Sequence, residues 1–141
     1  MKYLLLLLVF LSFLDAKIYR DSSIEVVLDD DAKLMWVDDP SVIKNLMNHF
    51  EAEKYCNNLT LFGFSDWRLA YIDEFEKIVY KKNVKTNINF AFKYNVPDGY
   101  WASTAQWRTL WHNADYMHFV SGTAYYDNRK TKKYVRCVRN Y

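Results

Sequence analysis

Apolar and β-branched residues early in the chain alternate with turn-forming residues in a pattern that predicts a β-hairpin. Residues 24–28 are rich in β-branched side chains, residues 29–31 are three aspartates, and residues 34–36 are apolar. Short runs of this kind on either side of a turn are typical of paired strands. We therefore predict strands over 24–28 and 34–36. The aspartates lack the spaced oxygen ligands and the glycine of a calcium loop, so no calcium site is expected there.

Two helices are predicted in the middle of the chain. Asn48 followed by Glu51 is the capping-box pattern that starts a helix. Spacings of three and four residues then place one apolar face toward the interior, formed by Ala52, Tyr55, Cys56 and Leu59. We expect this helix to end near Gly63. A second amphipathic pattern predicts a helix over 72–80.

The second half of the chain has a β-rich pattern after a long irregular segment. Residues 81–98 show no helical or strand periodicity and end in a Pro-Asp-Gly turn signature, which indicates a long loop. Strands are then predicted in an antiparallel meander, with turns at 121–122 and 127–128. The four predicted strands are 100–103, 116–120, 123–126 and 134–138. Together with the two helices, this pattern predicts an α+β fold.

The first sixteen residues have the layout of a secretory signal peptide. Lys2 precedes an apolar run over 4–14, and Asp15 and Ala16 precede a polar stretch. We therefore expect a signal peptide over 1–16 and a single domain over 17–141. The protein is then exported, to the periplasm, the medium or the cell surface. Leu14 occupies a position where a small residue is preferred. The alternative is therefore that the signal segment is not cleaved, and it would then be the only part of the protein that contacts the membrane.

The composition is that of a globular domain with an uneven charge distribution. Apolar residues make up 51% of the chain, and aromatic residues 18%. Residues 17–53 contain 4 basic and 9 acidic side chains, whereas residues 54–141 contain 14 basic and 7 acidic ones. Export argues against a nucleic acid as the partner, and an anionic glycan or lipid surface is the more natural one. The alternative is a basic face that only aids solubility.

The two cysteines of the chain are expected to form a disulfide. Cys56 lies on the inner face of the first predicted helix, and Cys137 lies in the last predicted strand. An isolated pair in an exported chain is most simply explained as a disulfide. Two unpaired buried thiols are the alternative. The three histidines do not have metal-ligand spacing, so no metal and no other cofactor is expected.

The order and spacing of several motifs resemble those of the bacterial Lcl C-terminal domain family. The resemblance spans about residues 25–139. The matching residues are Leu34-Met35-Trp36, Cys56, Leu59, Gly63, Ser65-Asp66-Trp67-Arg68-Leu69, Tyr100-Trp101, Ser103-Thr104, Ser121-Gly122 and Tyr134-Val135-Arg136-Cys137-Val138-Arg139. This family is named for the terminal domain of a collagen-like adhesin.

The resemblance implies a C-type lectin-like fold, related to that of formylglycine-generating sulfatase-modifying domains. In it two helices flank short antiparallel strands, a disulfide joins a helix to the last strand, and a binding surface lies on the irregular region before the final strands. The chain departs from the family pattern at Ala70-Tyr71, where a proline is usual, and near Asp115, where an aromatic residue is usual.

Aromatic and polar residues are densest between the predicted strands 100–103 and 116–120. Flat aromatic rings beside amide and cationic donors suit sugars or protein hot spots. Trp101, Trp67 and Arg68 are interpreted as structural, with Arg68 anchoring a carboxylate or backbone carbonyls. For Trp107 and Trp111 a core and a binding role are both open. The candidate ligand-binding residues are Gln106, Trp107, Arg108, Trp111, His112, Arg129 and Lys130.

No set of residues in the sequence indicates a reaction. The calcium-dependent sugar motifs Glu-Pro-Asn and Trp-Asn-Asp are absent, as are the extra cysteines of the oxidase relatives. We therefore expect a non-enzymatic recognition module that binds a glycan or a partner protein at the cell envelope or surface. A structural component of an envelope complex is the alternative. An enzyme built on His112 and Asp115 ranks last, since no nucleophile lies beside them.

Overall fold

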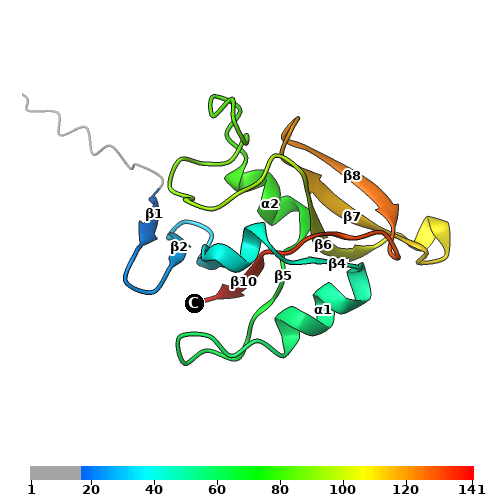
Figure 1. Ribbon diagram of the computed structural model, residues 1–141, viewed down its shortest axis with the longest axis horizontal. Helices are drawn as coiled ribbons and strands as arrows, with labels where there is room; N and C mark the ends of the chain where they lie inside the picture. The colour runs from blue at the N-terminus through cyan, green and yellow to red at the C-terminus, as the bar shows by residue number, and fades with distance from the viewer. Residues whose placement is uncertain (1–16) are drawn as a thin grey trace, which may run out of the picture.

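The computed structural model describes residues 17–141, and the expected signal peptide over 1–16 lies outside them. Two five-stranded sheets and two α-helices pack around a shared core (Figure 1). The first sheet is antiparallel and contains, in spatial order, β1 (Ile18–Asp21), β2 (Val26–Asp29), β3 (Leu34–Val37), β10 (Cys137–Asn140) and β5 (Arg68–Leu69).

The second sheet carries the longest strands of the described chain. Its spatial order is β4 (Leu46–Met47), β9 (Lys133–Tyr134), β6 (Gly99–Ala105), β7 (Asn113–His118) and β8 (Thr123–Asn128). All its neighbours are antiparallel except β6 and β9, which pair in parallel at Tyr100 and Tyr134. The helices are α1 (His49–Asn57) and α2 (Ile72–Ile78), and short 3₁₀ turns cover Pro40–Ile43 (η1) and Trp107–Thr109 (η2). The predicted α+β class is confirmed.

The predicted hairpin is confirmed as β2 and β3, which pair in register from Val26 with Val37 to Asp29 with Leu34. The sequence pattern missed β1, which extends this hairpin by pairing with β2. It also missed the two-residue strand β4. Elements of two to four residues carry too few positions for a periodic signal.

Helix α1 begins where the sequence predicted but ends earlier. The Asn48 side chain accepts a hydrogen bond from Glu51 N at 2.9 Å, and the Glu51 carboxylate accepts one from Asn48 N at 2.9 Å. The expected end near Gly63 is wrong, because the helix stops at Asn57. Asn58 N donates to Lys54 O and Leu59 N donates to Cys56 O, which closes the last turn. The apolar periodicity continued past that turn only because Leu59 packs against the core.

Helix α2 begins at Ile72 as predicted and ends two residues early, at Ile78, because Val79 is extended and pairs with Ile88. Its first turn is closed without the usual proline, since Tyr71 N donates to the Glu74 carboxylate at 2.8 Å. The same carboxylate accepts two hydrogen bonds from Arg68, at 2.8 and 2.9 Å. The prediction that Arg68 anchors a carboxylate is therefore confirmed.

The predicted meander is confirmed for β6, β7 and β8 but not for the last strand. Residues 134–138 do not form one strand: β9 stays in the second sheet, and β10 pairs with β3 and β5 of the first. The chain changes sheets at Arg136, whose fully buried side chain is turned into the junction. The turn expected at 127–128 falls within β8, and the strand expected over 116–120 is β7, Asn113–His118.

The disulfide between Cys56 and Cys137 is present, and it joins the inner face of α1 to β10 as expected. The Cα atoms of the two residues are 5.5 Å apart. Neither cysteine is exposed to solvent. The open alternative of two unpaired thiols is thus ruled out in this structure, and the crosslink ties the middle of the chain to its end.

A buried ion network around Asp38 joins the first sheet to the irregular segment 81–98. The Asp38 carboxylate accepts hydrogen bonds from Arg20 Nε at 2.6 Å and from Arg136 Nη1 at 3.2 Å. It also accepts the backbone N–H groups of Lys93 at 2.9 Å and Tyr94 at 3.1 Å. Because Asp38 and Arg136 are both buried, this network fixes part of a long loop against the core.

Candidate functional site

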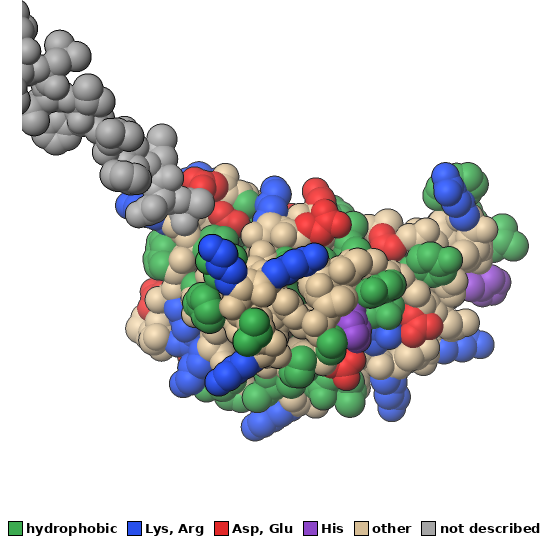
Figure 2. All heavy atoms as spheres, turned by 90° about the horizontal axis from the view of Figure 1, so that it is seen from above, with side chains coloured by type: hydrophobic (Ala, Val, Ile, Leu, Met, Phe, Trp, Pro, Cys, Tyr) green, Lys and Arg blue, Asp and Glu red, His purple; other side chains and the backbone are tan. Residues whose placement is uncertain are grey.

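The connection between β6 and β7 forms a protruding loop, which we call the tip loop and define as residues 106–112. It contains η2 and projects from one end of the second sheet, at the right of Figure 1. Three apolar side chains of the loop are exposed: Trp107 by 67%, Leu110 by 72% and Trp111 by 59%. Hydrophobic and basic side chains also gather on this projecting end in the space-filling view (Figure 2). Both tryptophans are therefore exposed, which excludes a core role, and their binding role stays a prediction.

The backbone of the tip loop is held in a defined shape. Gln106 N donates to Asn113 O at 2.7 Å, and Trp111 N donates back to Gln106 O at 3.0 Å. Leu110 and Trp111 both have left-handed backbone angles, with φ of 53° and 59°. Such angles are unfavourable for residues with a side chain and persist only where the surrounding structure holds them. The surrounding hydrogen bonds hold this strained turn, so the three apolar side chains are presented outward.

Gln106 connects the tip loop to β7 through hydrogen bonds. Its side-chain amide donates to the Asp115 carboxylate of β7, and its backbone oxygen also accepts the Thr109 hydroxyl at 2.9 Å. Burial raises the pKa of Asp115, whereas the hydrogen bond from Gln106 opposes that rise. Among residues 17–141 the Asp115 carboxylate accepts its side-chain hydrogen bond from Gln106, and no hydrogen bond joins it to His112.

Arg129 fastens the tip loop to the start of α1. Its Nε donates to His49 Nδ1 at 2.9 Å, its Nη2 donates to Glu53 at 3.2 Å, and its guanidinium lies 3.8 Å from the centre of the Phe50 ring. Its backbone N–H donates to His112 O at 2.9 Å. The Arg129 side chain is thus largely buried and committed to intramolecular contacts.

His49 is the buried end of this connection. Its Nδ1 accepts the hydrogen bond from Arg129, so the ring proton is on Nε2, which donates to Ala102 O at 2.8 Å. Burial is the main cause that lowers the pKa of His49, and the nearby Arg129 cation adds to it. The neutral imidazole is therefore the form that fits the site.

The remaining candidate residues are at the surface. Arg108 is exposed, and its guanidinium lies 5.6 Å from the centre of the Trp107 ring. His112 and Lys130 are also exposed. The structure therefore places five of the seven candidate residues outward, while Gln106 and Arg129 hold the loop.

Two exposed apolar residues near these side chains were not among the predicted site residues. Leu110 lies between the two tryptophans, and Phe50, which is 52% exposed, lies beneath Arg129. Phe50 sits next to His49 but outside the apolar face of α1, so an apolar residue on the polar side of a helix was the available signal. Trp101, interpreted as core, is fully buried and donates from Nε1 to Met47 O at 3.0 Å.

The described residues show neither a metal-binding cluster nor a membrane-spanning helix. Over 17–141, no three histidine, cysteine or carboxylate side chains come close enough to hold a metal ion. Within the same residues, no helix has both the length and the apolar character needed to cross a membrane.

Residues 25–139 match the family model described as the Lcl C-terminal domain, which covers most of the chain. No curated protein and no solved structure matched the chain in the other two comparisons.

Proposed function

The chain belongs to the Lcl C-terminal domain family, and we propose that it is an exported, non-enzymatic recognition module that binds its partner through the tip loop. The observation that carries the proposal is the exposure of Trp107, Leu110 and Trp111 on a strained but well-bonded turn. Exposed apolar residues that gather at one place on a soluble domain mark interaction sites. Tryptophan and arginine are also the residues most often found at binding hot spots.

A partner protein is the ligand class that the shape of the tip loop supports best. The loop projects from the domain, so it suits insertion into a concave surface on another molecule (Figure 1). Leu110 is the most exposed of the three apolar side chains and has no group that bonds a sugar hydroxyl. Arg108 beside Trp107 adds a charged donor at the edge of the apolar contact. This arrangement resembles an apolar anchor with a polar rim.

A glycan is the second candidate, and a separate observation favours it. Two exposed indole rings lie in the same loop as the donor side chains of Arg108 and His112, which suits the stacking and hydrogen bonding of a sugar ring. An acidic glycan would in addition be attracted by the basic residues of the β8–β9 turn.

Export and a C-type lectin-like architecture are part of the same proposal. A disulfide between two buried cysteines is typical of proteins from oxidising compartments, which supports export to the periplasm or cell surface. The bond from the first helix to the last strand agrees with the architecture that the family resemblance implies. The long irregular segment before β6 agrees with it too.

Binding to the envelope fraction of the source cells tests the proposal. Immobilised residues 17–141 are compared with the double variant Trp107→Ala/Trp111→Ala, and bound proteins are quantified. The matched control is Tyr125→Ala/Tyr126→Ala, which removes two exposed aromatic side chains from β8. We expect the tip variant alone to lose a specific bound protein. Equal capture by both variants and the unchanged domain would refute the proposal.

A glycan array and a heparin column separate the two ligand classes. Retention that depends on Trp107 and Arg108, without a protein partner, would assign a glycan instead. A structural role in an envelope complex predicts a different result, namely a complex that survives purification and buries a surface outside the tip loop.

A further inference from the structure

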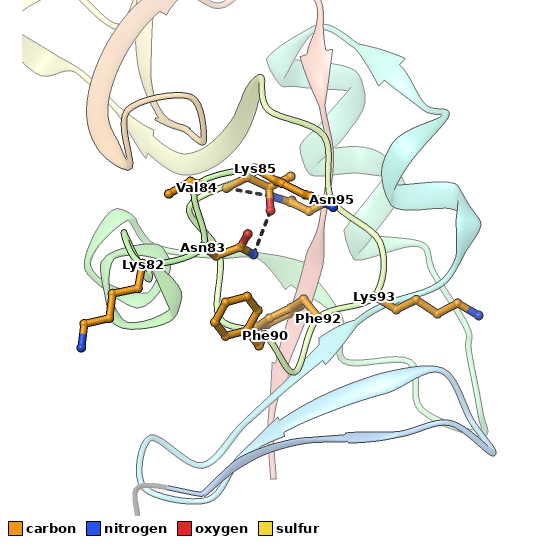
Figure 3. A pocket seen from close by; sticks show the side chains of 9 residues that line it. Lys82, Asn83, Val84, Lys85, Phe90, Phe92, Lys93 and Asn95 are labelled. Carbon is orange, nitrogen blue, oxygen red and sulfur yellow. Dashed lines mark hydrogen bonds between the residues drawn. The ribbon is translucent and has the colours of Figure 1, made fainter.

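The irregular segment 81–98 encloses a pocket that the proposed function does not use. Its volume is about 430 Å³, within the range of small-molecule sites. The segment lies at the top of Figure 1, whereas the tip loop lies at the right, beyond β7. We call this site the 82–95 pocket, and Figure 3 shows it from close by. It is lined by Lys82, Asn83, Val84, Lys85, Thr86, Phe90, Phe92, Lys93 and Asn95.

The apolar part of the pocket is aromatic and unusually open to solvent. Phe90 is 69% exposed and contacts Tyr80 edge to face, with ring centres 5.6 Å apart. Val84 is 87% exposed. Phe92 is buried, and the guanidinium of Arg136 lies 4.8 Å from its ring centre. A chain that leaves Phe90 and Val84 in water gains nothing for its core, so these side chains are available to a ligand.

The charged part of the pocket is entirely positive. Lys82, Lys85 and Lys93 line it, and no carboxylate does. Among the residues that the structure describes, none of these three lysines forms an ion pair. In Figure 3 the Lys82 and Lys93 side chains lie on opposite sides of the pocket and extend away from it. Long flexible stems allow these ammonium groups to approach an anion from two sides.

The pocket is preformed although its segment contains no regular helix or strand. Asn83 Nδ2 donates to Ile88 O at 2.9 Å and to the Thr86 hydroxyl at 3.3 Å, which ties the two sides of the loop together. The backbone N–H groups of Lys93 and Tyr94 are held by the buried Asp38. A long ordered loop in a small domain is often functional, and a preformed one loses little freedom on binding.

We infer that the 82–95 pocket binds a small organic anion with a flat aromatic ring, such as an aromatic carboxylate. The ring packs against Phe90 and Phe92, and the carboxylate pairs with the lysine ammonium groups. A neutral sugar fits less well, because it has no negative charge to pair with the lysine ammonium groups. An inorganic anion alone would leave the aromatic floor unused.

Titration of the ¹⁵N-labelled domain with 1-naphthoate tests this inference. We expect saturable chemical-shift changes confined to residues 80–95 and their contacts. Two probes of matched size, 1-naphthylmethylammonium and 1-naphthalenemethanol, separate charge from ring burial. We expect the cation not to bind and the alcohol to bind more weakly by up to about fivefold, the most that one exposed ion pair supplies.

Variants assign the binding to named side chains. Lys85→Gln/Lys93→Gln should raise the dissociation constant by up to about fivefold for each ion pair lost. Phe90→Ala should also raise it, because the ring of the ligand loses apolar contact. The controls Lys132→Gln and Tyr126→Ala change exposed residues of the same kinds elsewhere and should leave it unchanged. The tip variant Trp107→Ala/Trp111→Ala should also bind normally, so failure here and failure of the tip loop are distinguishable.

Three results would overturn the inference. They are no saturable binding of 1-naphthoate, equal binding of the cationic probe, and shifts spread over the surface that persist in Phe90→Ala. Circular dichroism of each variant shows whether it is folded. If Lys85→Gln/Lys93→Gln is not folded, Lys85→Gln alone, which removes only a surface charge, replaces it in the titration.

Discussion

Replacing Asp38 by asparagine removes the charge at the centre of the buried ion network. Each carboxylate oxygen accepts two hydrogen bonds: Oδ2 from Arg20 Nε and Lys93 N, and Oδ1 from Arg136 Nη1 and Tyr94 N. An asparagine has one oxygen, so in either orientation its NH₂ group faces two donors. Arg136 then keeps a buried charge without a counter-ion.

The expected loss of stability is about 3 to 5 kcal/mol, the usual effect of removing one partner from a buried ion pair. Total stabilities of domains this size are roughly 5 to 15 kcal/mol. The variant should therefore unfold about 10 to 20 °C lower than the unchanged domain. Arg136 retains its hydrogen bonds to Val37 O and Tyr94 O, so we do not expect complete unfolding at room temperature.

Urea unfolding followed by circular dichroism measures the difference. The matched control is Asp31→Asn, since Asp31 is an exposed carboxylate without an ion pair among residues 17–141, and it should change stability by less than about 0.5 kcal/mol. If Asp38→Asn loses less than about 1 kcal/mol, the network does not hold the segment 81–98 and the reasoning is wrong.

Three further predictions concern stability. Cys137→Ser should lower the free energy of unfolding by roughly 4 kcal/mol, because the disulfide to Cys56 closes a loop of 81 residues in the unfolded chain. Adding reductant to the unchanged domain should cause an equal loss. The lowered pKa of His49 means that the unfolded chain binds its proton first, so stability should fall as the pH drops below 6.5. Urea unfolding at pH 7.5 and 5.5 should show a smaller loss of unfolding free energy for His49→Gln than for the unchanged domain. An equal loss would contradict the conclusion that His49 causes the pH dependence. Glu74→Gln should lower the free energy of unfolding, measured in urea, by about 1 to 2 kcal/mol, because its partner Arg68 is only partly buried. No change would count against a stabilising role for the Arg68–Glu74 pair.

Capping and turn motifs in the sequence correctly located the elements whose ends depend on neighbouring residues in the chain. The capping box of Asn48 and Glu51 set the start of α1, and the turn at Gly122 set the β7–β8 connection. The end of α1 was not predictable in the same way, because Leu59 continues the apolar spacing without being helical. The division of the last strand depends on Arg136, whose burial is decided by Asp38 far away in the sequence.

The candidate site was predictable in position but not in detail. The density of aromatic and basic residues pointed to the tip loop, and the structure shows its tryptophans exposed. Composition did not distinguish Gln106 and Arg129, whose side chains bond to other elements, from Arg108, which is exposed at the loop surface. Such roles depend on contacts with Asp115 and His49, which come from other elements.

Photo-crosslinking from the tip loop tests the central proposal most directly. Leu110 is replaced by p-benzoylphenylalanine, and cells that export the full chain are irradiated. We expect one dominant crosslinked partner, lost when Trp107 and Trp111 are replaced by alanine and absent when the crosslinker is placed at Tyr126. No crosslink at position 110, or the same products from position 126, would contradict a recognition role for the tip loop.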